Sequence, residues 1–110
     1  MGFQTTKDNG VLIVDVDGQL IVGNRQELKQ KVLDELDKGE RNFLIDFSNT
    51  GYIDSSGLGV LVSLSKKIRE QDGELRLVNL NEDLRTLFEL TKLDTLFQIS
   101  DSRQEALSSF

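Results

Sequence analysis

Residues 43–47 read Phe-Leu-Ile-Asp-Phe, a short apolar run with two aromatic side chains. Runs of this length and composition are typical of a strand that is buried inside a sheet. After a loop, residues 55–71 place Leu58, Leu61 and Ile68 on one helical stripe, which predicts an amphipathic helix. A buried strand followed by such a helix indicates one unit of an α/β layer structure.

The rest of the chain continues this alternation of strands and helices. Asn9-Gly10 predicts a tight hairpin turn between the first two strands, and Gly18 is expected to end the second. Asn24 and Asn81 are expected N-caps, because a short polar side chain can accept a hydrogen bond from the free N–H groups at a helix start. The expected strands span residues 3–7, 11–17, 43–47, 75–80 and 96–99, and the expected helices have their caps or first residues at 24, 55, 81 and 100 or 101.

Strands that alternate with helices predict an α/β fold, with a small mixed β-sheet that has a parallel core and is packed by about four helices. The 110 residues suffice for one domain, and neither an internal repeat nor a shift in composition divides them. We therefore expect a single domain over residues 1–110.

Composition excludes several classes of function. The chain has no Cys and no His, which removes disulfides, thiolate metal sites and every catalytic arrangement that needs an imidazole base. A net charge of −6 disfavours direct binding to nucleic acid, which needs Lys and Arg to replace counterions on phosphates. No apolar run approaches the ~20 residues of a membrane-spanning helix. We expect no metal, no cofactor, no membrane insertion and a cytoplasmic location.

Residues 54–59, Asp-Ser-Ser-Gly-Leu-Gly, form the most unusual segment. A glycine inside a helix costs about 1 kcal/mol relative to alanine, so two in one turn indicate either close internal packing or a bare surface that a partner can approach. A helix start has free N–H groups and favours a nearby anion. A phosphate on Ser55 would be tolerated there, and it would add roughly −1.5 to −2 charge to an exposed face. The alternative is that Ser55 only caps the helix.

Residues 52–61, Tyr-Ile-Asp-Ser-Ser-Gly-Leu-Gly-Val-Leu, resemble the signature of the STAS domain, and most closely that of the bacterial anti-sigma factor antagonists. The similarity extends over nearly the whole chain. Further matching segments are Asp17-Gly18-Gln19-Leu20, Leu44-Ile45-Asp46-Phe47, Gly73-Glu74-Leu75-Arg76-Leu77 and residues 84–93.

This resemblance implies a binding protein controlled by phosphorylation and not an enzyme. In the family, an anti-sigma factor that is also a serine kinase phosphorylates the first serine after the aspartate, and Ser55 is the matching residue. The unphosphorylated protein binds the anti-sigma factor and thereby frees a sigma factor, and a PP2C-type phosphatase reverses the modification. The residues implied in partner binding are Asp54 and Ser56, which shape the helix start, and Gly57, Leu58 and Gly59, which form the docking surface.

One departure from the family pattern concerns partner recognition. The family turn reads Gly-Glu-Leu-Asp, whereas this chain has Gln19 and Ile21 in place of both acidic residues. In the family this turn lies near the signature and contributes to kinase contact. Either the partner here has a different matching surface, or this chain is recognised less well.

Two other functions are alternatives. One is a constitutive STAS adaptor or a nucleotide-binding subunit of a larger assembly. The other is a hydrolase with Ser55 as nucleophile, which has no histidine base and for which Lys66 lies too far along the same helix.

The first half of the signature helix is apolar on more than one side, through Val60, Leu61, Val62 and Leu64. A helix packed on a sheet needs only one apolar stripe. The excess is either buried by a neighbouring helix or exposed as a patch beside Ser55, of the kind that marks a protein–protein site.

Overall fold

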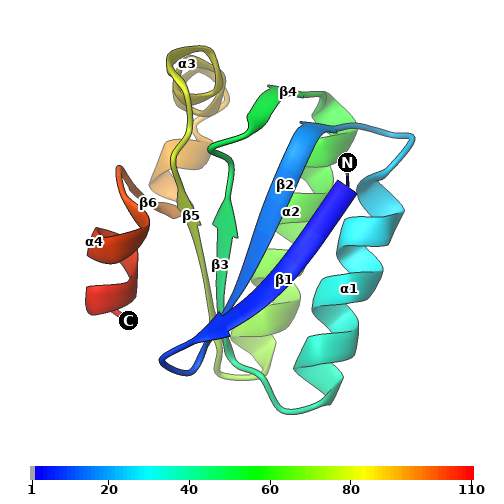
Figure 1. The fold of residues 1–110 in the computed structure, drawn as a ribbon. Coiled ribbons are helices and arrows are strands. Elements are labelled where there is room, and N and C mark those ends of the chain that lie inside the picture. The colour runs from blue at the N-terminus through cyan, green and yellow to red at the C-terminus, as the bar shows by residue number, and fades with distance from the viewer. Residues whose placement is uncertain (1) are drawn as a thin grey trace.

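The computed structural model describes residues 2–110 and has the predicted mixed α/β architecture (Figure 1). Six strands form the sheet in the order β1-β2-β3-β5-β6, and β4 pairs with the far end of β2. β1 and β2 are antiparallel and the other pairings are parallel. The elements are β1 (Gly2–Asp8), β2 (Val11–Leu20), α1 (Arg25–Asp37), β3 (Asn42–Asp46), β4 (Thr50–Ile53), α2 (Ser55–Glu70), β5 (Glu74–Val78), α3 (Glu82–Leu90), the 3₁₀ helix η1 (Leu93–Thr95), β6 (Gln98–Ser100) and α4 (Arg103–Ser108).

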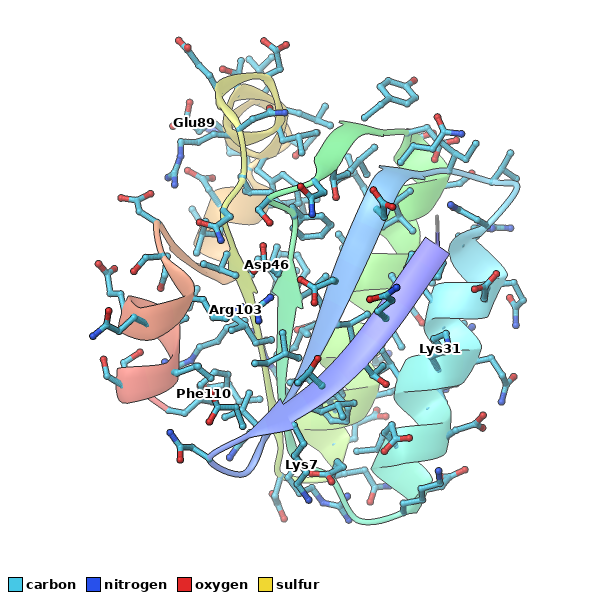
Figure 2. All side chains as sticks on the ribbon, viewed as in Figure 1. Lys7, Lys31, Asp46, Glu89, Arg103 and Phe110 are labelled. Atoms are coloured by element: carbon cyan, nitrogen blue, oxygen red, sulfur yellow. The ribbon has the colours of Figure 1, made fainter. Side chains whose placement is uncertain are left out.

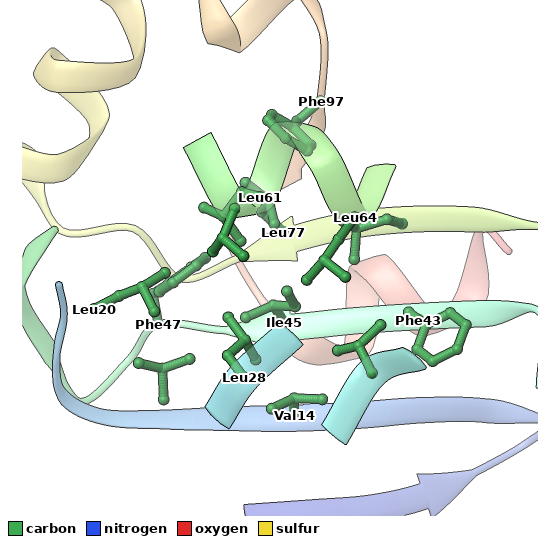
Figure 3. Packing of buried hydrophobic residues seen from close by; sticks show 14 of the residues in the cluster. Val14, Leu20, Leu28, Phe43, Ile45, Phe47, Leu61, Leu64, Leu77 and Phe97 are labelled. Carbon is green, nitrogen blue, oxygen red and sulfur yellow. The ribbon is translucent and has the colours of Figure 1, made fainter. Parts of the chain in front are cut away.

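The sheet is covered on both faces, and the alternation of β2 explains how one strand serves two cores. Leu12, Val14 and Val16 belong to the main core under α1 and α2, which Figure 3 shows from close by. The intervening Val11 and Ile13 belong to a smaller core under α4. Successive side chains of a strand point to opposite faces, so an uninterrupted apolar run is needed where both faces are buried.

The predicted hairpin turn is confirmed. Asn9 and Gly10 both have positive φ, at 53° and 79°, and Asp8 pairs with Val11 across the turn. A two-residue turn of this kind needs positive φ at both central positions, which Asn and Gly tolerate better than other residues.

Gly18 does not end β2, contrary to the sequence-based expectation. The strand continues to Leu20, and its register shifts between Gly18 and Gln19, where the pairing passes from β3 to β4. Gly18 has a φ of +94°, which a residue with a Cβ rarely adopts, so the glycine allows the bend. This bend brings the end of β2 beside β4, a four-residue strand that the sequence did not predict.

Three smaller expectations also need correction. Asn24 makes no capping bond to α1 but holds the preceding loop, because its Oδ1 accepts from Ile21 N at 2.9 Å and its Nδ2 donates to Gln19 O at 2.8 Å. Ser102, which follows the two predicted candidates, caps α4 by accepting from Glu105 N. The last strand begins two residues late, because η1 precedes it. The Asn81 cap is confirmed.

An arginine and two carboxylates fix α4 to the sheet, as Figure 2 shows for Arg103 and Asp46. Asp15 and Asp46 are paired in register on β2 and β3, and Arg103 Nη2 lies 2.6 Å from Asp15 Oδ1 and 2.9 Å from Asp46 Oδ2. Asp46 also accepts hydrogen bonds from Ser48 N and Asn79 Nδ2. The single positive charge of the arginine therefore offsets the repulsion between two neighbouring carboxylates.

We expect this cluster to make the protein sensitive to acid. Burial raises the pKa of Asp46, but the hydrogen bonds from Ser48, Asn79 and Arg103 outweigh it and hold the pKa below its ordinary value of 3.8. A depressed folded-state pKa gives stability that is present above the unfolded pKa and is lost as pH falls through the folded one. Asp46→Asn should lower the free energy of unfolding by about 2 kcal/mol at pH 7.

Urea unfolding at pH 7 and at pH 3 measures both effects. The parent protein should lose stability between the two pH values, and Asp46→Asn should lose less. An equal loss in the two proteins would show that Asp46 does not contribute to the acid sensitivity.

Candidate functional site

Asp54 fixes the start of α2 and joins it to the loop between β2 and α1. Its Oδ1 accepts from Gly57 N at 2.8 Å, which makes it the N-cap of α2, and its Oδ2 accepts from Val22 N at 3.1 Å. Its own backbone N–H donates to Leu20 O. Both carboxylate oxygens are thus engaged in holding the backbone, and the cap of the helix is Asp54 and not Ser55.

Ser55 is the first residue of α2 and is exposed. Its hydroxyl makes no hydrogen bond within residues 2–110, because Asp54 already provides the cap. Ser56, the next residue, is half-buried. An exposed hydroxyl with no structural bond can be modified without loss of a contact that stabilises the fold.

The two glycines of the signature have different environments. A Cβ on Gly57 would lie 2.5 Å from Leu20 O and 2.9 Å from Ile53 Cγ2, so this glycine permits α2 to pack against β2 and β4. A Cβ on Gly59 would meet nothing within 4 Å, and Gly59 is exposed. Close internal packing therefore explains Gly57, and a bare surface describes Gly59.

Of the three residues predicted to form the docking surface, only Gly59 is exposed. Gly57 is buried, and Leu58 is 8% exposed and belongs to the main core. These two residues contribute to the site indirectly, because their packing holds the start of α2 against the sheet.

Two exposed apolar side chains beside Ser55 were not predicted. Tyr52 on β4 is 57% exposed, and Val22, whose N–H is bound by Asp54, is 64% exposed. We call Val22, Tyr52, Ser55 and Gly59 the docking face. Exposed apolar side chains that cluster on one face are typical of protein–protein sites.

Most of the apolar residues in the first half of α2 are buried. Val60, Leu61 and Leu64 are buried, and Val62 alone of this group is exposed, at 37%. Of the two alternatives that the sequence left open, burial within the protein therefore applies to most of these residues.

The turn that departs from the family pattern lies next to the docking face. Gln19 pairs with Tyr52 across β2 and β4, and the Asn24 side chain binds the Gln19 carbonyl. The bend at Gly18 explains this position, which sequence spacing alone does not give.

Other chemistries find little support among the described residues. No group of three or more carboxylates, within residues 2–110, is arranged to hold a metal ion. Lys66 lies eleven residues after Ser55 on α2, which is about 16 Å along the helix axis, too far to act as a base for it. No helix in the described part of the chain has the length and apolar character needed to cross a membrane.

Comparison with known proteins places the whole fold in one family. The family model described as STAS domain matches residues 2–106. "Putative anti-sigma factor antagonist BtrV" of Bordetella bronchiseptica is 33% identical over 104 residues, which cover 94% of this chain and 90% of that protein. The crystal structure of TM1081 from Thermotoga maritima, which carries the same description, has a TM-score of 0.91 and 33% identity, and the match covers 96% of this chain and 92% of that one.

A third solved structure is that of the Bacillus cell fate determinant SpoIIAA in the phosphorylated form. It has a TM-score of 0.77 at 18% identity, with 97% of each chain covered. At that identity the likeness concerns the fold alone. Together with the family model and the two relatives at 33% identity, it leads to one conclusion: this chain belongs to the STAS domain family.

Proposed function

We propose that this protein is an anti-sigma factor antagonist whose binding is controlled by phosphorylation of Ser55. In the unphosphorylated state it binds a serine-kinase anti-sigma factor, which then releases its sigma factor, and a PP2C-type phosphatase removes the phosphate from Ser55. The protein acts by binding and is a substrate of both enzymes. The observation that carries the proposal is the exposed Ser55 hydroxyl, free of structural bonds, within a face that also presents Tyr52 and Val22.

The relatives support the general function. Both relatives at 33% identity are described as anti-sigma factor antagonists, and each aligns over nearly its full length with this chain. SpoIIAA, which shares the fold, has been solved in a phosphorylated form. The proposal extends these properties to this chain through one residue, Ser55.

The expected mechanism is electrostatic. A partner that covers Tyr52 and Val22 removes water from the docking face and brings its own surface close to Ser55. A phosphate there adds roughly −1.5 to −2 charge, which must then lose its hydration or find cations in the partner. The fold itself is not disturbed, because the helix start favours an anion and the Asp54 cap does not involve the Ser55 hydroxyl.

Ser55→Ala tests the assignment of the acceptor. Protein isolated from its native cells should contain a population with one added phosphate, and Ser55→Ala should contain none. The same variant should still capture the anti-sigma factor from lysate, because the docking face lacks only a hydroxyl. Ser102→Ala serves as control, since Ser102 is an exposed serine at the start of a different helix, α4.

Mass measurement of the intact protein and identification of the captured kinase-fold protein give the result. A phosphate that persists in Ser55→Ala would place the acceptor elsewhere. If the parent protein binds its partner but never contains phosphate, the constitutive adaptor becomes the better description.

A further inference from the structure

A polar groove lies between α1 and α2 on the side of the molecule that carries Ser55. Its volume is about 170 Å³. The residues that line it are Arg25, Gln26 and Lys29 from α1, and Gly59, Val60 and Ser63 from α2. A water molecule occupies about 30 Å³ in the liquid, so the groove has room for a small oxyanion.

Two positive charges face this groove without a counter-charge. Arg25 and Lys29 are four residues apart and therefore lie on one face of α1, one turn from each other. The ion pairs within residues 2–110 use other cations, namely Lys7, Lys38, Arg76, Arg85 and Arg103. No carboxylate is among the residues that line the groove, although the protein as a whole has a net charge of −6.

The nearby acidic side chains are directed elsewhere. Glu27, in the same turn of α1, approaches β1, where its Oε2 lies 3.6 Å from the position that a Cβ on Gly2 would occupy. Both oxygens of Asp54 accept backbone N–H groups. The two cations of the groove are thus available to an added anion.

Ser55 lies one helical turn before Gly59, on the same line of α2. The distance along the helix axis between the two residues is about 6 Å. Because Gly59 has no side chain and its surroundings are open, no side chain of that residue stands between Ser55 and the groove. Arg25 and Lys29 have long flexible side chains that can span such a distance.

We propose that Arg25 and Lys29 form a cradle in the same chain for the phosphate on Ser55. This inference rests on the proposed function, and it deepens it by assigning two residues that act only in the phosphorylated state. Guanidinium binds phosphate oxygens through two parallel hydrogen bonds, and the ammonium of Lys29 adds a point charge. The cradle holds the phosphate on the docking face and removes both cations from contact with an incoming partner.

Phosphorus NMR of a protein with phosphoserine incorporated at position 55 during translation tests the cradle without any kinase. The measured quantity is the second pKa of the phosphate, which is about 6 in an unstructured peptide. Neighbouring cations favour the dianion and lower this pKa. Arg25→Gln combined with Lys29→Gln should raise it by about half a unit relative to the parent phosphoprotein.

Lys31→Gln combined with Lys38→Gln provides the matched control. It removes the same total charge, from α1 and its C-cap, but Lys31 is rotated by about 200° from Lys29, and Lys38, which pairs with Glu35, lies seven residues beyond Lys31. The control should leave the phosphate pKa within about 0.2 units of the parent, since neither lysine lines the groove and salt screens charges that are further away.

A larger rise in the phosphate pKa in the groove variant than in the control supports the cradle. Equal values in the two variants would overturn it. Either outcome is independent of whether a kinase modifies Ser55 in cells, which the native mass of the protein decides separately.

Discussion

Gly57→Ala is expected to destabilise the protein by about 2–3 kcal/mol, although alanine is the better helix former. The new Cβ would lie 2.5 Å from Leu20 O and 2.9 Å from Leu20 Cγ, and a backbone carbonyl cannot move aside as a flexible side chain can. The helix would have to shift away from the junction of β2 and β4. Since domains of this size are stable by only about 5–15 kcal/mol, the effect is large enough to measure by urea unfolding.

Gly59→Ala is the matched control, two residues away in the same helix. Its Cβ meets nothing within 4 Å, so only the helix propensity changes, and the free energy of unfolding should rise by about 0.5–1 kcal/mol. Opposite signs for the two substitutions are the expected result. Equal effects of the two alanines would contradict the assignment of Gly57 to close packing.

Ser55→Asp is expected to weaken binding of the anti-sigma factor by about tenfold. The added carboxylate must lose hydration or meet like charge when the partner covers the docking face, and a charge at the rim of an interface costs at most a few kcal/mol. Asp has one charge and two acceptor oxygens, so it mimics a phosphate only in part. Stability should hardly change, because an acidic residue is favourable in the first turn of a helix.

Ser102→Asp controls for the added charge itself. Ser102 is an exposed serine at the start of α4, where Asp is as good an N-cap as Ser, and α4 packs on β5 and β6 on the sheet face opposite α2. Calorimetric titration with the purified anti-sigma factor should give the parent affinity for this variant. If Ser55→Asp also binds with the parent affinity, the charge at Ser55 does not control docking.

Much of the fold follows from local patterns that tertiary contacts do not override. Residues 11–17 were expected to form a strand, and the structure has a separate core on each side of it. The Asn9-Gly10 turn and the Asn81 cap are properties of two or three residues, which makes them readable without knowledge of the rest of the chain.

The features that were missed depend on contacts between distant segments. β4 is a strand because β2 bends at Gly18 and meets it, and residues 50–53 have too few apolar side chains to predict this alone. The exposure of Tyr52 and Val22 is likewise not visible in the sequence. A sequence cannot show which of two apolar residues remains uncovered.

The residues of the site differ in how far the sequence alone reveals their roles. Ser55 could be singled out because two glycines follow it within one helical turn and because the segment resembles the STAS signature. The division between buried Gly57 and open Gly59 needed coordinates, because the carbonyl that approaches Gly57 belongs to Leu20, 37 positions away. Arg25 and Lys29 face α2 because of the way the two helices pack against one sheet, and the sequence does not show that packing.

The most direct test of the phosphorylation switch compares one purified anti-sigma factor binding to this protein before and after phosphate is placed on Ser55. The difference between the two dissociation constants, measured at one ionic strength, isolates the effect of the dianion. We expect the phosphoprotein to bind at least about a hundredfold more weakly, because like charges brought together at an interface cost several kcal/mol. Equal dissociation constants for the two forms would contradict the account.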